Sequence, residues 1–170
     1  MKLINRTSIS DSVLKLILMD AKRSLGKSIN TNILIRARFS KHGGGYIMGN
    51  LFRVCGKWNP KNPEEWIYVK NGVVMEVTIP KNHWIDAIAS AKSFFETCKH
   101  EWGHVYDVQQ SEKGKVGFGF AGNVNKRRTR HSLRPEEMRV EEYVAGPKVK
   151  GFDSYESIMM LAIEIEKILK

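Results

Sequence analysis

Hydrophobic and polar positions in the first half of the chain predict one helix followed by several strands. Apolar side chains recur at three- and four-residue spacing in Ser8–Ser24, which predicts a core-facing helix that ends near Gly26. Alternating patterns predict four strands, at Asn32–Phe39, Tyr46–Val54, Glu65–Lys70 and Val73–Ile79. The last two flank Asn71-Gly72, a dipeptide typical of tight hairpins. Strands that follow one another in this way predict a small, mostly antiparallel sheet.

The second half of the chain is predicted to be helical apart from one long loop. Helical spacing of apolar residues predicts a long helix over about His83–Gln110. Glycines and basic residues in Ser111–Arg134 predict a loop. Two further helices are expected over Pro135–Ala145, where proline occupies the favoured first position, and over Ser154–Leu169. A chain of 170 residues without internal repeats predicts one α+β domain that covers residues 1–170.

The helical segment Thr97–Tyr106 contains the motif that the rest of the chain is expected to serve. His100, Glu101 and His104 form an H-E-x-x-H pattern within it. Residues four apart on a helix lie roughly 40° apart around the axis, so both imidazoles can bind one Zn²⁺ ion. Glu101 lies beside them, where it can take a proton from a water activated by the metal. The same pattern also arises by chance on amphipathic helices.

The chain offers several candidates for a third metal ligand. A catalytic zinc ion has three protein ligands and one position open for water. Acidic, amide and imidazole side chains downstream of the motif could complete the set: Asp107, Gln110, His131, Glu136, Glu137, Glu141 and Glu142. Asp107 shares the face of the histidines, but its short side chain lies a turn further on, which favours a supporting role. Glu137 and Glu141 lie one turn apart on one face of the helix that Pro135 begins.

The stretch TCKHEWGHVY resembles the extended active-site consensus of the zincin metallopeptidases at every position. The later helix resembles that of the gluzincins, in which a Glu downstream of H-E-x-x-H is the third ligand. This resemblance implies Glu137 as the ligand and Glu141 as the residue that orients a ligating imidazole, or the two roles exchanged. Metzincins, another zincin branch, differ from this chain at the positions of Asp107 and Gln110.

The resemblance also implies a fold and an activity. The expected fold is zincin-like, with about four mostly antiparallel strands, an N-terminal helix, a long active-site helix and two C-terminal helices. The expected activity is zinc-dependent hydrolysis of peptide bonds with Glu101 as general base. His131 and Tyr143 are candidate donors to the oxygen of the scissile carbonyl. A protein or peptide substrate is expected to lie along an edge strand, Val73–Ile79 or a neighbour.

The charge of the chain supports a second hypothesis. Lys and Arg number 28 against 18 Asp and Glu, a formal net charge of +10, which attracts polyanions. Basic residues gather in the segment 126–131, at Lys126, Arg127, Arg128 and Arg130. These residues could contact phosphates in a nucleic-acid-associated or regulatory zinc-binding protein that is latent as a peptidase. Few aromatic residues accompany them, so base stacking is not expected.

Composition sets the class of protein. The chain is 42% hydrophobic and 27% charged, which is typical of a globular protein rather than a disordered one. Apolar runs are too short for a membrane span, and the first residues lack the apolar core of a secretory signal. Cys55 and Cys98 make no disulfide framework. These features predict a cytoplasmic protein that makes no contact with membranes.

Overall fold

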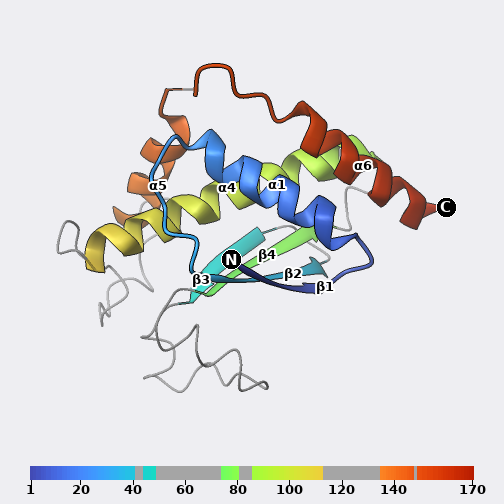
Figure 1. The fold of residues 1–170 in the computed structure, drawn as a ribbon, viewed down its shortest axis with the longest axis horizontal. Coiled ribbons are helices and arrows are strands. Elements are labelled where there is room, and N and C mark those ends of the chain that lie inside the picture. The colour runs from blue at the N-terminus through green and yellow to red at the C-terminus, as the bar shows by residue number, and fades with distance from the viewer. Residues whose placement is uncertain (41–43, 49–73, 81–85, 113–134, 148) are drawn as a thin grey trace.

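The computed structural model of the chain consists of a sheet with helices packed on one side (Figure 1). It describes residues 1–170 apart from 41–43, 49–73, 81–85, 113–134 and 148. The elements in chain order are β1 (Lys2–Arg6), α1 (Asp11–Ser24), β2 (Leu34–Ser40), β3 (Gly44–Met48), β4 (Val74–Pro80), α4 (Ala87–Glu112), α5 (Pro135–Ala145) and α6 (Tyr155–Leu169).

The sheet has four described strands in the order β1-β2-β4-β3. β1 pairs with β2 in parallel, with Leu3 opposite Ile35, and β2 pairs with β4 in parallel, with Ile35 opposite Met75. β3 pairs with β4 in the antiparallel direction, with Ile47 opposite Met75. The three consecutive strands β1, β2 and β4 are therefore parallel, and β3 is the antiparallel edge.

The expectation of a mostly antiparallel sheet in a zincin-like fold is therefore wrong. It assumed that strands consecutive in the sequence pair with one another, whereas β4 lies between β2 and β3. It also overlooked β1, from which the chain crosses through α1 to reach β2, and such a crossover makes the two strands parallel. The predicted strand Glu65–Lys70, the Asn71-Gly72 turn and most of the strand Tyr46–Val54 lie outside the described residues.

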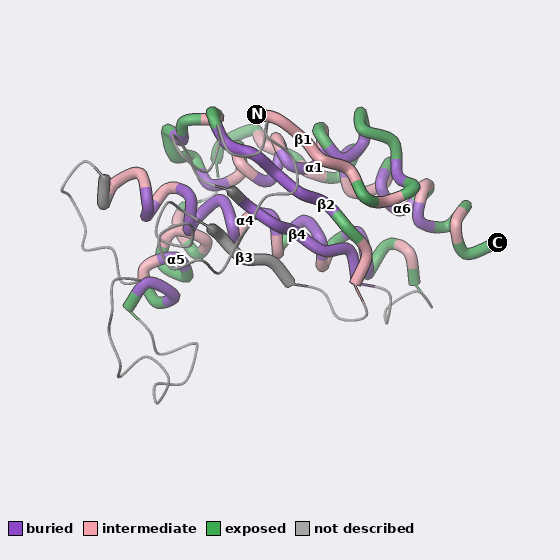
Figure 2. The backbone as a smooth tube through the Cα atoms, turned by 90° about the horizontal axis from the view of Figure 1, so that it is seen from below, coloured by how far each residue is buried: buried purple, intermediate pink, exposed green. Residues whose placement is uncertain are grey.

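The core lies between the sheet and the helices (Figure 2). Alternate residues of the central strands face it, including Ile35 and Ala37 of β2 and Met75 and Val77 of β4, as a period of two requires. The helices contribute the apolar stripes that the sequence predicts, among them Leu14 and Ile17 of α1, Phe94 and Trp102 of α4 and Leu161 and Ile165 of α6. The long helix α4 therefore has one face anchored in the interior.

The predicted helices are confirmed, with small shifts at their ends. The N-terminal helix begins at Asp11, the long helix covers Ala87–Glu112, and the two C-terminal helices begin at Pro135 and Tyr155. Trp102 is completely buried, and its indole Nε1 donates a hydrogen bond of 2.9 Å to the Leu18 carbonyl of α1. Within the described parts of the chain, no helix combines the length and the apolar character that a membrane crossing needs.

Candidate metal centre

Two histidines of α4 and one glutamate of α5 form a cluster at the place where these helices meet. The Nε2 atoms of His100 and His104 lie 3.1 Å apart. Oε2 of Glu137 lies 3.2 Å from Nε2 of His100 and 3.3 Å from Nε2 of His104. The three side chains together could hold a metal ion. We refer to His100, His104 and Glu137 as the His–His–Glu cluster.

Helix geometry explains how the two imidazoles meet. A spacing of four residues stacks them one turn apart on the same face of α4, and their ring planes stand at 79° to each other. Each therefore presents the same ring nitrogen, Nε2, to the space between them. The side chains of His104 and Glu137 are 11% and 9% exposed, so these two are shielded from solvent, while that of His100 is 26% exposed and leaves the cluster partly open.

Glu141, one turn after Glu137 on α5, contacts the other side of the His100 ring. Its Oε1 atom lies 3.2 Å from Nδ1 of His100. A proton on Nδ1 that is donated to this carboxylate leaves the lone pair of Nε2 directed toward His104 and Glu137. The resemblance to the gluzincins implies Glu137 as the ligand and Glu141 as the orienting residue, or the two roles exchanged. Glu137 contacts Nε2 of both histidines and Glu141 contacts Nδ1 of His100, which fits the first of these orders.

Glu101 is a buried carboxylate next to the first histidine. It is 4% exposed, and burial raises its pKa to about 7, while the charges of His104 and His100 act in the opposite direction. Its Oε2 atom is buried without a hydrogen-bond partner among the described residues. A buried carboxylate oxygen with no donor is unusual, and a water or substrate proton would satisfy it.

The cluster attracts positive charge. The hydrogen bond to Glu137 raises the pKa of His100, burial lowers it, and the nearby charges of Glu101, Glu137 and Glu141 raise it further. Three carboxylates thus act on one imidazole. The same field that favours the imidazolium also favours a bound cation, which takes the place of the proton.

Asp107 and Tyr143 lie beside the cluster rather than in it. Nε and Nη2 of Arg139 donate to the two oxygens of Asp107 over 2.8 and 2.7 Å, and the Tyr143 hydroxyl donates to Oδ1 over 3.1 Å. Asp107 is 4% exposed, so this carboxylate is buried, while its partners Arg139 and Tyr143 are half-buried. The hydroxyl of Tyr143 is thereby directed to Asp107.

Sequence reasoning did not single out Arg139 or Gly103, although both join α5 to α4. A signal for Arg139 was available, because a carboxylate on the inner face of α4 needs a cation and Arg139 is the one basic residue of Pro135–Ala145. Gly103 packs against Val140, and a Cβ atom at Gly103 would lie 2.8 Å from Cγ1 of Val140. His131 and the basic residues of 126–131 lie outside the described residues.

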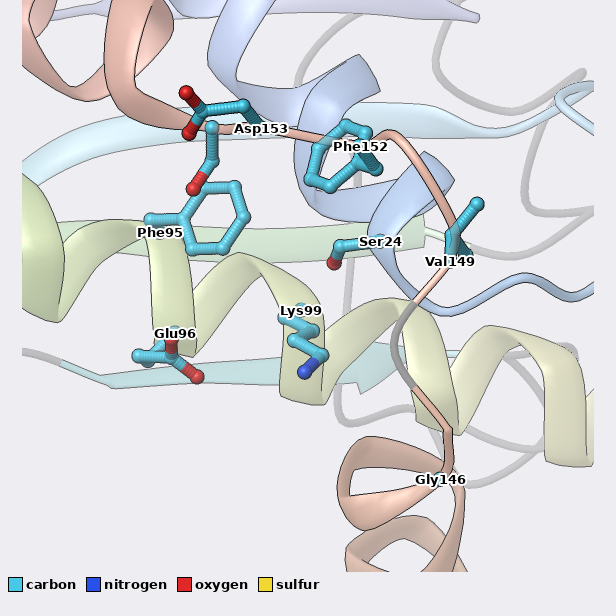
Figure 3. Close-up of a pocket in the computed structure, with 9 residues that line it drawn as sticks. Ser24, Phe95, Glu96, Lys99, Gly146, Val149, Phe152 and Asp153 are labelled. Atoms are coloured by element: carbon cyan, nitrogen blue, oxygen red, sulfur yellow. The ribbon is translucent and has the colours of Figure 1, made fainter.

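A separate hollow of about 290 Å³ lies between the end of α1, the middle of α4 and the segment that joins α5 to α6 (Figure 3). Phe95, Lys99 and Phe152 are among the residues that line it. Nζ of Lys99 donates a hydrogen bond of 3.0 Å to the carbonyl of Val144, which links α4 to the last turn of α5. None of the residues that line the hollow belongs to the His–His–Glu cluster.

Comparison with protein-family models, with curated proteins and with solved structures finds no significant match to this chain. The chemistry of the cluster is therefore the guide to what the protein does.

Proposed function

We propose that the protein is a zinc-dependent peptidase that uses Glu101 as its general base. The observation that carries the proposal is the spacing of the three ligand atoms, which lie 3.1, 3.2 and 3.3 Å apart. Ligands about 2.0–2.1 Å from a tetrahedral zinc ion stand roughly 3.3 Å from one another. Two neutral imidazoles with one carboxylate also form a ligand set of catalytic zinc sites, which leave a fourth position open.

The residues of this chain have distinct roles in the proposed reaction. His100, His104 and Glu137 would hold the ion, and Glu141 would orient the His100 ring. Zinc, when bound, polarises the scissile carbonyl and lowers the pKa of water toward about 7. Glu101 accepts a proton from the attacking water, whose oxygen bonds to the carbonyl carbon. It then passes that proton to the amine nitrogen as the carbon–nitrogen bond breaks.

The environment of Glu101 supports its role as a base. A carboxylate whose pKa is about 7 can take up a proton and release it near neutral pH, as both halves of the reaction require. Its buried Oε2 atom has no hydrogen-bond partner in the described part of the chain, which supports the presence of a proton donor beside it.

The sheet edge supports an extended polypeptide as the substrate. The sequence suggested Val73–Ile79 or a neighbour. Among the described strands β4 is an inner strand, and the edge nearest the motif helix is its neighbour β3 (Gly44–Met48). β3 packs against α4, the helix of the two histidines. An edge strand offers backbone donors and acceptors with which an extended peptide can pair, and no other described strand lies on the outer side of β3.

Substitution of Glu101→Gln tests the proposal. The variant should keep one equivalent of zinc and lose cleavage of an unstructured polypeptide such as casein by at least about 10²-fold. Glu96→Gln, an exposed position on the same helix, is the matched control and should retain cleavage. Full activity in the Glu101→Gln variant would overturn the general-base assignment, and a wild-type protein that binds no zinc would overturn the metal site.

The alternative role in nucleic-acid association stays a prediction, because its basic residues lie outside the described residues. A titration of nucleic-acid binding against salt tests it, since contacts to phosphates weaken steeply as salt increases.

A further inference from the structure

We infer that the ion pair between buried Asp107 and half-buried Arg139, together with Tyr143, positions the third metal ligand and thereby sets the affinity of the site for zinc. This inference rests on the proposed function. None of these side chains lies within the His–His–Glu cluster. They act through helix α5, which carries Glu137 and Glu141 as well as Arg139 and Tyr143.

The Asp107–Arg139 pair fixes both the distance between α5 and α4 and their relative orientation. Arg139 donates to the two oxygens of Asp107 through Nε and Nη2, at 2.8 and 2.7 Å. A two-pronged contact between planar groups restricts rotation as well as separation, unlike a contact through one atom. Tyr143, one turn further along α5, donates to the same carboxylate over 3.1 Å. Two successive turns of α5 are thus joined to one buried side chain of α4.

The other face of α5 carries the metal chemistry. On a helical wheel, Val140 lies between Arg139 and Tyr143 on one side and Glu137 and Glu141 on the other. Val140 sits on Gly103, where a side chain on the glycine would approach Val140 to 2.8 Å. The α5 helix is therefore seated on α4 at Val140, with the Asp107 contact to one side and the histidine contacts to the other.

Because α5 rests on α4 at Val140, the contacts to Asp107 on one side of α5 influence the position of Glu137 on the other side. A small rotation of α5 about the Val140 contact would move Glu137 relative to the two imidazoles, and the pair to Asp107 opposes such a rotation. The ring of Tyr143 also meets the ring of Tyr106 of α4 edge to face, with centroids 5.1 Å apart, which restrains the same side of α5. Glu137 is thereby held against both histidines by contacts that need no metal ion.

Arg139→Lys is the principal test, because it keeps the charge and removes the two-pronged geometry. The variant should fold, as judged by circular dichroism, and bind zinc about 10- to 100-fold more weakly in competition with a chromophoric chelator. In the cobalt(II)-substituted protein, the visible absorption bands should shift because the carboxylate ligand is held less well. A purely structural role would lower the melting temperature and leave these bands unchanged.

Arg38→Lys is the matched control. Arg38 contacts a buried carboxylate of the sheet, Glu76, through Nε at 2.7 Å, so the same substitution weakens an ion pair away from the cluster. Its zinc affinity should equal that of the wild type. Equal zinc affinity and equal cobalt spectra in the Arg139→Lys and wild-type proteins would overturn the inference.

Two further measurements keep the result decisive. If Arg139→Lys does not fold, Tyr143→Phe removes a single hydrogen bond to Asp107 and should weaken zinc binding several-fold. Unchanged zinc affinity in that variant would then overturn the inference. His100→Ala separates this inference from the proposed function. If the His100→Ala variant still binds zinc as the wild type does, or if the wild type binds no zinc, the metal site itself is refuted.

Discussion

Nδ1 of His100 lies 3.2 Å from Oε1 of Glu141, while Nε2 of the same ring faces Glu137 over 3.2 Å. One imidazole is therefore held from both sides by carboxylates one turn apart on α5. The side chain of Glu141 is 66% exposed and that of Glu137 is 9% exposed. This difference in burial fits the proposed roles, in which Glu137 would bind the ion and Glu141 would orient the His100 ring.

Replacement of Glu141 by glutamine should weaken zinc binding about tenfold while the ion remains bound. The amide still accepts a hydrogen bond from Nδ1 but lacks the charge that makes the imidazole a better ligand. Competition with a chromophoric chelator measures the change. Glu142→Gln, its exposed neighbour on α5, is the control and should bind zinc as the wild type does. If the Glu141→Gln variant bound zinc with the affinity of the wild type, Glu141 would have no part in the site.

Replacement of Glu137 by glutamine should have a larger effect, about 10²-fold or more in zinc affinity, because a charged ligand is replaced by a weak neutral one. Isothermal titration at constant pH measures the loss. If the two glutamates had exchanged roles, Glu141→Gln would be the more damaging substitution. The ratio of the two affinities therefore decides which carboxylate is the ligand.

Replacement of Gly103 by alanine should destabilise the protein by about 1–3 kcal/mol, because the new Cβ would lie 2.8 Å from Val140 Cγ1. In an unobstructed helix the same change would stabilise the folded protein by about 1 kcal/mol. The sign of the change in the free energy of unfolding therefore shows whether Gly103 and Val140 are in contact. Urea denaturation measures it. A second change, Val140→Ala, should recover part of the loss. A stabilised Gly103→Ala variant would contradict the close approach of α5 to α4.

The stability of the protein should fall between pH 10 and pH 12 through Tyr143. Burial, the charge of Asp107 and the hydrogen bond to it raise the pKa of Tyr143 from 10.0 to about 12. The folded protein therefore keeps a proton that the unfolded chain loses above about pH 10, so unfolding becomes easier as pH rises through this window. Below pH 10 both states are protonated, and the contribution of the group is constant.

Tyr143→Phe provides the comparison for this pH dependence. The difference in free energy of unfolding between the wild type and Tyr143→Phe should shrink as pH rises from 9 to 11.5, by urea denaturation with a chelator present. A difference that stays constant across this range would show that Tyr143 ionises as freely in the folded protein as in the unfolded one.

Zinc should stabilise the folded protein by mass action. At a free concentration about 100 times its dissociation constant, it adds roughly 2.7 kcal/mol to the free energy of unfolding. Thermal denaturation with and without a chelator measures the difference. His100→Ala should show no such difference, and a shift that persists in this variant would place the bound ion elsewhere on the protein.

The helices and the relative placement of the two histidines could be predicted from the sequence because their signals are local, whereas Glu137 was implied only by the resemblance to the gluzincins. The spacing of His100 and His104 determines their relative position on any helix, and the apolar stripe of Ser154–Leu169 repeats over four turns. Pro135 marks the start of α5 at the residue where the structure begins it. Each of these features depends on neighbours within a few positions of the chain.

The sheet could not be predicted because its order is set by distant contacts. Nothing near Val74–Pro80 indicates that β4 pairs with β2 on one side and β3 on the other. β1 is five residues long and partly exposed, so its pattern is too short to be distinguished from a loop. The pairing of Asp107 with Arg139 joins residues 32 positions apart and became visible only once α5 lay on α4.

The hydrogen bond from Trp102 to Leu18 bears on how the residues of the His–His–Glu cluster are held. It anchors α4 to α1 in the interior, directly between the two histidines in the sequence. Among the described elements, α5 packs mainly against α4, and it carries Met138, 51% exposed, toward solvent. The two histidines therefore stand on a helix anchored in the interior, whereas Glu137 stands on a helix whose position depends mainly on its contacts with α4.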